Sequence, residues 1–466
     1  MKLHFLGANR QVTGSRYCLE TTNSRVLIDC GLFQERQYTG RNWIESPLPP
    51  DSVDAMVVTH AHIDHCGLVP RFVKQGFNGP IYCTLPTSDL LDVMLNDAAH
   101  IQSEDAKYKA RRHKKKGSKS RFEPQPLFDQ NDVRETLQLV NGHHFNKVVK
   151  ITDDISVEFH PAGHILGSAM LEFNVTEAGT SRRVVFSGDI GQWDKPLLRD
   201  PTMFEQADYI VMESTYGDRV HKENGDIGEQ LEDVINRTLQ RGGKVLIPTF
   251  AVERAQELLY FLSDLVNSKR IPNVPVFLDS PMAVDVTQIF KSHRDHFDDE
   301  TWERIAAGDR PLQFSSLEFA RSAEQSKAIN EVSGPAIIMA TSGMCTAGRI
   351  KHHLKKNIDD AKCTVLFVGY QAHGTLGRQI VDGSEEVRIH GRTRKVRAEV
   401  AQIFGFSGHA DREGLLKWTR NFKSKPRRIF LTHGDEEAAE SLAAQIRQEL
   451  QWNVLIPHYE STTDLH

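Results

Sequence analysis

The stretch VVTHAHIDHCG, at residues 57–67, places four metal-ligand side chains within six residues, directly after a short apolar run. In an extended segment residues i and i+2 point the same way, so His60 and His62 can hold one ion. Asp64 and His65, on the following turn, can then face a second ion. Four such groups buried without a metal would repel or desolvate one another. The stretch therefore predicts a metal site at the end of a strand.

Two later strand ends offer the ligands that a site for two ions still needs. They are His164 in PAGHILGS and Asp189 in VVFSGDIG. A carboxylate can bridge two cations, whereas a neutral imidazole cannot. Taken alone, either residue is more often a turn residue or a helix cap. Their position in the same series of strand ends favours metal binding.

Length and composition limit the classes of protein that the sequence can encode. The chain has 466 residues, of which 39% are apolar and 26% charged, and this favours two or three packed domains. The mean hydropathy of −0.43 excludes an integral membrane protein, and we expect no secretory segment. Six scattered cysteines without a C-x-x-C pair favour a reducing cytoplasm. The net charge of −5 means that any affinity for nucleic acid must come from local patches.

The order of apolar and polar runs predicts an α/β protein in three segments. Residues 1–215 read as one sheet-rich unit that begins with an antiparallel meander. Residues 216–396 repeat strand and helix units, which is typical of a parallel, doubly wound sheet. Residues 397–466 are too few to fold alone, so we expect them to complete the first unit.

One run of basic residues interrupts the otherwise mixed composition. Between Lys107 and Arg121 the chain has nine lysines and arginines and no acidic residue. Two interpretations stay equally open: a solvated loop, or a patch that contacts a phosphate backbone.

The motifs together resemble those of the metallo-β-lactamase superfamily. The H-x-H-x-D-H run, LIDCG with Asp29, the histidine of GHILGS and the aspartate of SGD carry the resemblance. ESTYG with Glu213, FSGHAD with His409 and LTHGDEE with His433 are similar to the further motifs of the β-CASP subgroup, in the same order. The middle of the chain resembles the domain inserted in that subgroup. Within the subgroup, this chain most resembles prokaryotic proteins that are similar to the endonuclease subunit of the eukaryotic cleavage and polyadenylation factor.

The resemblance implies a fold and two metal sites. The fold would be a metallo-β-lactamase αββα sandwich with an inserted, doubly wound β-CASP domain. One zinc ion would be held by His60, His62, His164 and Asp189, and the other by Asp64, His65, His433 and the shared Asp189. Asp29 would lie behind the site and orient the ligands and the attacking water. Nitrogen and oxygen ligands suit zinc and leave manganese and iron open.

The chemistry that follows is hydrolysis of a phosphodiester. Two cations lower the pKa of a water between them and neutralise charge that grows on a phosphoryl group. The resemblance implies that His409 is the general acid and Glu213 its carboxylate partner. The alternatives are a capped turn for His409 and a backbone or arginine partner for Glu213. The histidine at position 433 resembles the pattern of the branch of the subgroup that acts on RNA.

Glycine turns before helices in the inserted domain predict contacts to the RNA backbone. A glycine turn alone is more often a plain connection. The residues expected to contact RNA are Ser342, Thr346, Arg349, Thr375, Arg378 and, in the basic run, Lys114, Lys115 and Lys116.

The sequence thus predicts a zinc-dependent ribonuclease that hydrolyses single-stranded RNA in RNA processing or decay. Two other classes stay open: a metallo-hydrolase of small molecules, because a fold does not fix a function, and a non-catalytic scaffold that binds RNA. We expect a cytoplasmic protein without a membrane partner. Internal or terminal cutting, and a monomer or a homodimer, are not distinguished by the sequence.

Overall fold

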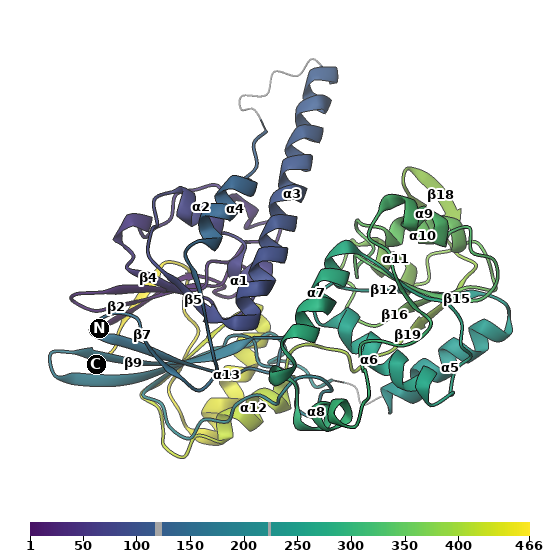
Figure 1. The fold of residues 1–466 in the computed structure, drawn as a ribbon. Helices are drawn as coiled ribbons and strands as arrows, with labels where there is room; N and C mark the ends of the chain where they lie inside the picture. The colour runs from purple at the N-terminus through teal and green to yellow at the C-terminus, as the bar shows by residue number, and fades with distance from the viewer. Residues whose placement is uncertain (117–123, 222–224) are drawn as a thin grey trace. The chain divides into compact units, whose positions relative to one another are not determined.

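The computed structural model describes residues 1–116, 124–221 and 225–466, with the side chains of 114–116 outside the description (Figure 1). The chain forms two compact units. The first contains residues 1–194, 199–220 and 409–466, and the second contains residues 195–198 and 221–408. The domain limits predicted from the sequence, at 215/216 and 396/397, differ from the limits of these two units. The second limit moves because β19 (Glu399–Gln402) pairs with β16 (Thr364–Phe367) in the sheet of the second unit.

The first unit contains two seven-stranded sheets. In the order of pairing, the first sheet consists of β22 (Ser461–Asp464), β1 (Lys2–Gly7), β2 (Arg16–Glu20), β3 (Arg25–Ile28), β4 (Ala55–Val57), β5 (Ile81–Thr84) and β6 (Val140–His143). The second consists of β21 (Val454–Leu455), β20 (Arg428–Thr432), β11 (Tyr209–Glu213), β10 (Thr180–Phe186), β9 (Ala169–Glu177), β8 (Ile155–Pro161) and β7 (Val148–Lys150). The strands β1, β2 and β3 form the expected antiparallel meander.

One apolar core joins the two sheets of the first unit. Phe5 and Val57 of the first sheet pack in the same buried cluster as Phe173, Val184 and Phe430 of the second. Four helices accompany the first sheet: α1 (Ile63–Cys66), α2 (Val69–Lys74), α3 (Leu85–Lys116) and α4 (Gln130–Leu137). The outer face of the second sheet is covered by α12 (Arg412–Arg420) and α13 (Glu436–Leu450). Figure 1 shows these two groups of helices on opposite sides of the sheets, which confirms the αββα sandwich.

The C-terminal part of the chain completes both sheets of this unit. β20 runs parallel to β11, and β22 pairs with β1 near the N-terminus. Residues 409–466 belong to the first unit. Residues 397–408 belong instead to the second unit.

The second unit contains a parallel six-stranded sheet. Its order is β14 (Leu317–Phe319), β13 (Val276–Asp279), β15 (Ala336–Ala340), β12 (Lys244–Pro248), β16 and β19. Its helices are α5 (Ile227–Gln240), α6 (Arg254–Asn267), α7 (Pro281–Ser292), α8 (Asp299–Ala306), α9 (Ala323–Ile329), α10 (Ile350–Asn357) and α11 (Leu376–Val381). Every residue of β12, β13, β15 and β16 is buried, as expected for a sheet with helices on both faces. The predicted doubly wound sheet is confirmed.

The basic run does not begin as a loop. Residues 107–116 form the last turns of α3, a helix of 32 residues that projects from the first unit (Figure 1). The sequence has neither glycine nor proline between Pro86 and Gly117, so nothing interrupts the helix once it has begun. The rest of the run, and the side chains of Lys114, Lys115 and Lys116, lie outside the described residues.

Among the described residues, no helix combines the length and the apolar character that are needed to span a membrane.

Candidate metal centre

The strand ends of the first unit bring the predicted ligands together. In the second sheet β8, β10, β11 and β20 run in the same direction, so their carboxyl ends lie at one edge. His164 follows β8, Asp189 follows β10, and His433 follows β20. His60 and His62 follow β4 of the first sheet, while Asp64 and His65 lie on α1. Ligands that are up to 373 residues apart in the chain thus meet at one edge of the sandwich.

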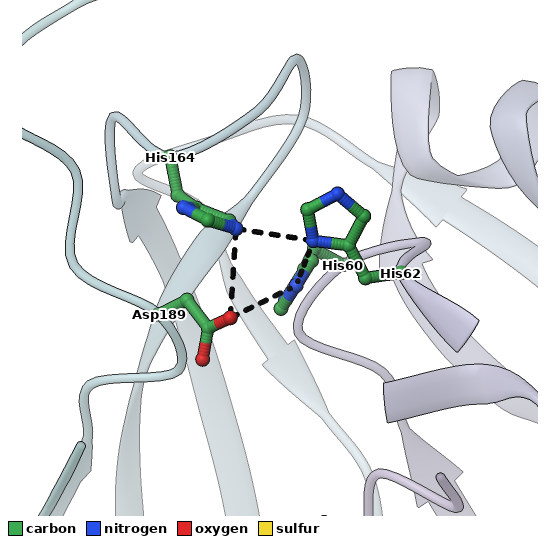
Figure 2. A group of neighbouring side chains, drawn as sticks. All are labelled: His60, His62, His164 and Asp189. Carbon is green, nitrogen blue, oxygen red and sulfur yellow. Dashed lines mark hydrogen bonds and ion pairs between the residues drawn. The ribbon is translucent and has the colours of Figure 1, made fainter. Parts of the chain in front are cut away.

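Three imidazoles and one carboxylate form the first ligand group (Figure 2). His62 Nδ1 lies 3.2 Å from His60 Nε2 and 3.1 Å from His164 Nε2. Asp189 Oδ2 lies 3.5 Å from both His60 Nε2 and His164 Nε2. Figure 2 shows these side chains pointing toward one another: His60 and His62 come from one segment, and His164 and Asp189 come from two other loops.

Asp64, His65 and His433 form the second ligand group. His433 Nε2 lies 3.1 Å from His65 Nε2 and 3.3 Å from Asp64 Oδ2. The other oxygen of Asp189 approaches this group, because Oδ1 lies 3.2 Å from His65 Nε2 and 3.6 Å from His433 Nδ1. Asp189 therefore faces both groups, one with each carboxylate oxygen.

The donor atoms fit bound cations better than they fit one another. Imidazole nitrogens face imidazole nitrogens at 3.1–3.2 Å, and each such pair can share at most one proton. Asp189 Oδ1 is buried and makes no hydrogen bond among the described residues. Burial raises the pKa of Asp189, but His433, His65 and His60 outweigh it and hold the pKa well below the usual range. A buried carboxylate whose Oδ1 makes no hydrogen bond, set among converging nitrogens, is suited to zinc.

Asp29 fixes one ligand from behind. His65 Nδ1 donates to Asp29 Oδ2 at 2.7 Å, which leaves Nε2 directed at Asp189 and His433. The backbone N–H and the hydroxyl of Thr59 donate to Asp29 Oδ1 at 2.8 and 3.1 Å. These contacts fix the orientation of the His65 ring.

Glu213 and His409 form a pair beside the ligands. His409 Nδ1 donates to Glu213 Oε2 at 3.0 Å, and the ring centroids of His409 and His164 are 4.5 Å apart. Glu213 is buried at the end of β11, where it also accepts hydrogen bonds from Ile190 N and Thr215 Oγ1. Burial lowers the pKa of His409, but the Glu213 carboxylate outweighs it and raises the pKa to about 9.

The alternatives for these two residues are partly realised. Asp411 caps α12 by accepting from Gly414 N, so a capped turn does follow His409. Glu213 does accept from a backbone N–H, that of Ile190. Neither contact replaces the pairing of Glu213 with His409.

The residues predicted to contact RNA in the inserted domain all lie in the second unit, whereas the ligands lie in the first. Arg349 donates to Asp279 Oδ1 and to the carbonyl oxygens of Ala320 and Arg321, so its guanidinium has protein partners. Arg378 pairs with Asp382 on the surface.

The hydroxyls of the same set make local contacts. Thr375 Oγ1 caps α11 by accepting from Arg378 N. Ser342 Oγ lies 3.3 Å from Thr346 Oγ1 at the turn after β15.

Sequence reasoning missed a series of exposed aromatic rings. Three neighbouring strands, β12, β16 and β19, are each followed within three residues by an aromatic side chain. Phe250 is 43% exposed, Tyr370 61% and Phe404 46%. The signal in the sequence is an aromatic residue in the polar turn that ends a buried strand.

Three family models match the chain in succession. The model of the metallo-beta-lactamase superfamily matches residues 12–214, the Beta-Casp domain matches 255–380, and the Zn-dependent metallo-hydrolase RNA specificity domain matches 393–457.

Curated relatives match over nearly the whole chain. A ribonuclease of Thermus thermophilus is 38% identical over 437 residues, which cover 94% of each protein. The transcription termination factor FttA of Methanosarcina mazei is 34% identical over 458 residues, which cover 96% of this chain and 69% of that protein. A solved structure from Enterococcus faecalis, described as a protein of unknown function, covers 100% of this chain with a TM-score of 0.59 at 13% identity. That last likeness concerns the fold alone.

Proposed function

The chain belongs to the β-CASP subgroup of the metallo-β-lactamase superfamily, and from this membership we propose that it is a zinc-dependent ribonuclease acting on single-stranded RNA. The observation that carries the proposal is the junction of two ligand groups at Asp189, next to the Glu213–His409 pair. The RNA specificity model and the ribonuclease relative support RNA as the substrate.

Two zinc ions would be held by the side chains that converge on Asp189. The first would take His60, His62, His164 and Asp189, and the second would take Asp64, His65, His433 and Asp189. Bound there, zinc lowers the pKa of a water and neutralises charge that grows on the phosphoryl group.

The protein's own groups would orient the reaction. Asp29 holds His65 through Nδ1 and so fixes the direction of Nε2. Asp64 lies at the partly exposed side of its ligand group, where its carboxylate can orient the attacking water. Both residues would act through position rather than through a covalent bond to RNA.

His409 would supply the proton that the leaving oxygen needs. Its Nδ1 faces the Glu213 carboxylate, so the transferable proton is the one at Nε2. Glu213 is itself fixed by Ile190 and Thr215, which keeps the ring in one orientation. The His409 side chain is 20% exposed and therefore accessible to a substrate.

In the second unit we propose that bases stack on the exposed rings of Phe250 and Tyr370. Stacking tolerates every base, which suits single-stranded RNA of mixed sequence. Replacing both residues with alanine should lower the affinity for RNA about tenfold or more. The single variant Phe250→Trp should keep the affinity of the wild type, because it keeps an aromatic ring. Unchanged affinity of the alanine variant, measured by fluorescence anisotropy, would remove these rings from the RNA path.

The test of the proposed function is cleavage of labelled RNA. Zinc-loaded protein is incubated with one single-stranded RNA labelled at its 5′ or its 3′ end, and with the DNA of the same sequence. We expect RNA products that need zinc, and comparing the two labels over time distinguishes internal from terminal cutting. Intact RNA after incubation, with zinc present and RNA bound, would instead support a non-catalytic scaffold.

A small-molecule hydrolase is tested in the same assay. If RNA is the substrate, it should compete with bis-p-nitrophenyl phosphate for hydrolysis. Absence of competition would favour small substrates.

A second role follows from the names of several relatives. Because seven relatives are termed transcription termination factors, we propose that the RNA cut by this chain includes nascent transcripts in the cytoplasm. Cleavage of RNA still held by a stalled RNA polymerase would support this role, and strict preference for free RNA would contradict it.

A further inference from the structure

A second polar pocket lies in the first unit, between β2 and α2. It opens to solvent, and its enclosed part has room for little more than a water molecule, so a larger ligand would bind at its open side. Three arginines line it, together with neutral side chains: Arg16, Arg41, Asn42, Ile44, Ser46, Leu68, Arg71, Phe72 and Gln75. None of the described residues that line it is acidic. None is among the proposed zinc ligands either, so the pocket is separate from the metal centre.

Arg16 is the unusual member of this group. Arg16 is only 7% exposed, yet it forms no ion pair with any residue that the structure describes. Its Nε is buried without a partner. The Cys30 thiol lies beside it: burial raises the pKa of Cys30, and the charge and hydrogen bonding of Arg16 lower it. A buried guanidinium normally has a carboxylate partner, because burying an unpaired charge is costly.

The other two arginines are held by neutral groups. Arg71 donates to the carbonyl oxygens of Trp43 and Ile44 at 3.0 and 3.4 Å. Burial lowers the pKa of Arg71, and the charge of Arg16 lowers it further, as expected for neighbouring cations.

Arg41 donates to Gln11 Oε1 at 2.9 Å and lies 3.8 Å from the centroid of the Tyr459 ring. Within the described part of the chain, Arg16, Arg41 and Arg71 form no salt bridge, although many other arginines of the chain do, such as Arg237 and Arg304. Three positive charges therefore face one pocket without a counter-ion from the protein.

We propose that this pocket binds a phosphoryl group. Guanidinium groups match phosphate oxygens with paired hydrogen bonds, and three of them would neutralise a dianion that no protein carboxylate neutralises here. Trp43 is 55% exposed and its ring lies 5.9 Å from the Arg71 guanidinium, so a base attached to the phosphate could stack beside it. The ligand is thus a nucleotide, either free or as part of an RNA chain.

The first experiment measures binding of inorganic phosphate to the zinc-loaded protein by isothermal titration calorimetry. The variant R41Q/R71Q removes two charges that lie at the pocket but leaves the buried Arg16 in place, so the fold should persist, as circular dichroism would verify. R36Q is the matched control, because Arg36 is exposed nearby but does not line the pocket. We expect phosphate affinity at this site to fall at least about tenfold in R41Q/R71Q and to stay unchanged in R36Q.

Phosphate bound at the metal centre must be separated from phosphate bound here. The same titration with Asp189→Asn should retain the binding that R41Q/R71Q loses, whether or not this variant still cleaves RNA. Equal phosphate binding by wild type and R41Q/R71Q would overturn the proposal and leave the ribonuclease proposal unaffected.

A second experiment distinguishes the two sources of phosphate, in the Asp189→Asn background so that RNA stays intact. A nucleoside 5′-monophosphate and a ten-nucleotide single-stranded RNA are each titrated with and without the R41Q/R71Q change. A loss confined to the RNA assigns the pocket to the RNA chain, and a loss for the mononucleotide assigns it to a free nucleotide. If neither affinity changes, the nucleotide assignment is wrong.

Discussion

Asp189 is the residue on which the proposed centre depends most. Its two oxygens face different ligand groups, and one of them has no hydrogen bond among the described residues. An amide of the same shape would keep the packing but would lose the negative charge that the facing imidazoles and two cations require.

We therefore expect Asp189→Asn to lose bound zinc and to lower RNA cleavage at least about a hundredfold. Loss of a bridging ligand should lower metal affinity and activity more than loss of a residue that only hydrogen-bonds to a ligand. Zinc content is measured by mass spectrometry of the purified protein. Asp153→Asn, at a fully exposed carboxylate, is the control. Zinc content equal to that of wild type in Asp189→Asn would contradict the bridging role.

His409→Ala should have the opposite profile. It should keep wild-type zinc content but lose about 10²–10⁴-fold in turnover, which is the usual contribution of a general acid. His144→Ala, at an exposed histidine of the same unit, should cleave normally. Wild-type turnover of His409→Ala in a single-turnover assay would assign the proton to another group.

Six of the seven proposed ligands were expected from the residues themselves, because they lie at strand ends or on the turn that follows one, and His433 was expected only from the family resemblance. It could not show what Arg349 binds. That guanidinium is engaged by Asp279, which precedes it by 70 residues, and only the folded second unit brings the two together. The Glu213–His409 pair was expected from the family resemblance and not from spacing, for the same reason.

Asp279 gives a pH dependence of stability in the second unit. Burial raises the pKa of Asp279, but hydrogen bonds from His353, Ser326 and Arg349 outweigh it and lower the pKa. A lowered folded-state pKa stabilises the fold above the unfolded-state pKa of about 3.9, and this stability is lost as pH falls through the folded-state pKa.

Asp279→Asn should therefore lower the free energy of unfolding by about 3 kcal/mol at neutral pH, with a smaller deficit below about pH 4. Urea unfolding followed by circular dichroism measures both values. Asp285→Asn, at a more exposed carboxylate paired with Arg321, should change stability by less than about 1 kcal/mol. A deficit of Asp279→Asn that is constant with pH would show that the charge is not responsible.

At the scale of elements, strands were predicted better than the long helix. Short apolar runs with polar ends fix strands locally, so β4, β8 and β10 precede the polar strand ends quoted from the sequence. The basic run was expected as a solvated loop or as a patch that contacts phosphate, and the structure contradicts only the loop for its first part. Ten residues of that run, 107–116, continue a helix that starts far upstream, at Leu85.

The basic end of α3 gives a prediction that belongs to this helix. Replacing Lys114, Lys115 and Lys116 with alanine should weaken RNA binding and reduce the slope of log affinity against log salt by up to about 2, if these lysines contact phosphates. Alanine keeps the helix, since its helix propensity exceeds that of lysine. Lys147→Ala/Lys150→Ala is the surface control. An unchanged slope would show that these lysines do not contact phosphates and are only solvated.

At the scale of the whole molecule, all seven proposed ligands belong to the first of two compact units. Zinc stabilises only the unit that binds it. Removal of zinc with a chelator should therefore lower the unfolding temperature of the first unit and leave that of the second unchanged. Differential scanning calorimetry can assign the transitions, because Asp279→Asn should lower the one that the chelator does not affect. A chelator effect on both transitions would mean that the units unfold together.

The late position of His433 and of its strand β20 has a consequence for biosynthesis. The second sheet lacks β20 beside β11, and the second ligand group lacks one imidazole, until residue 433 has left the ribosome. A nascent chain therefore carries the earlier ligands without a finished catalytic centre. The second ligand group is therefore completed only when almost the whole chain has been made.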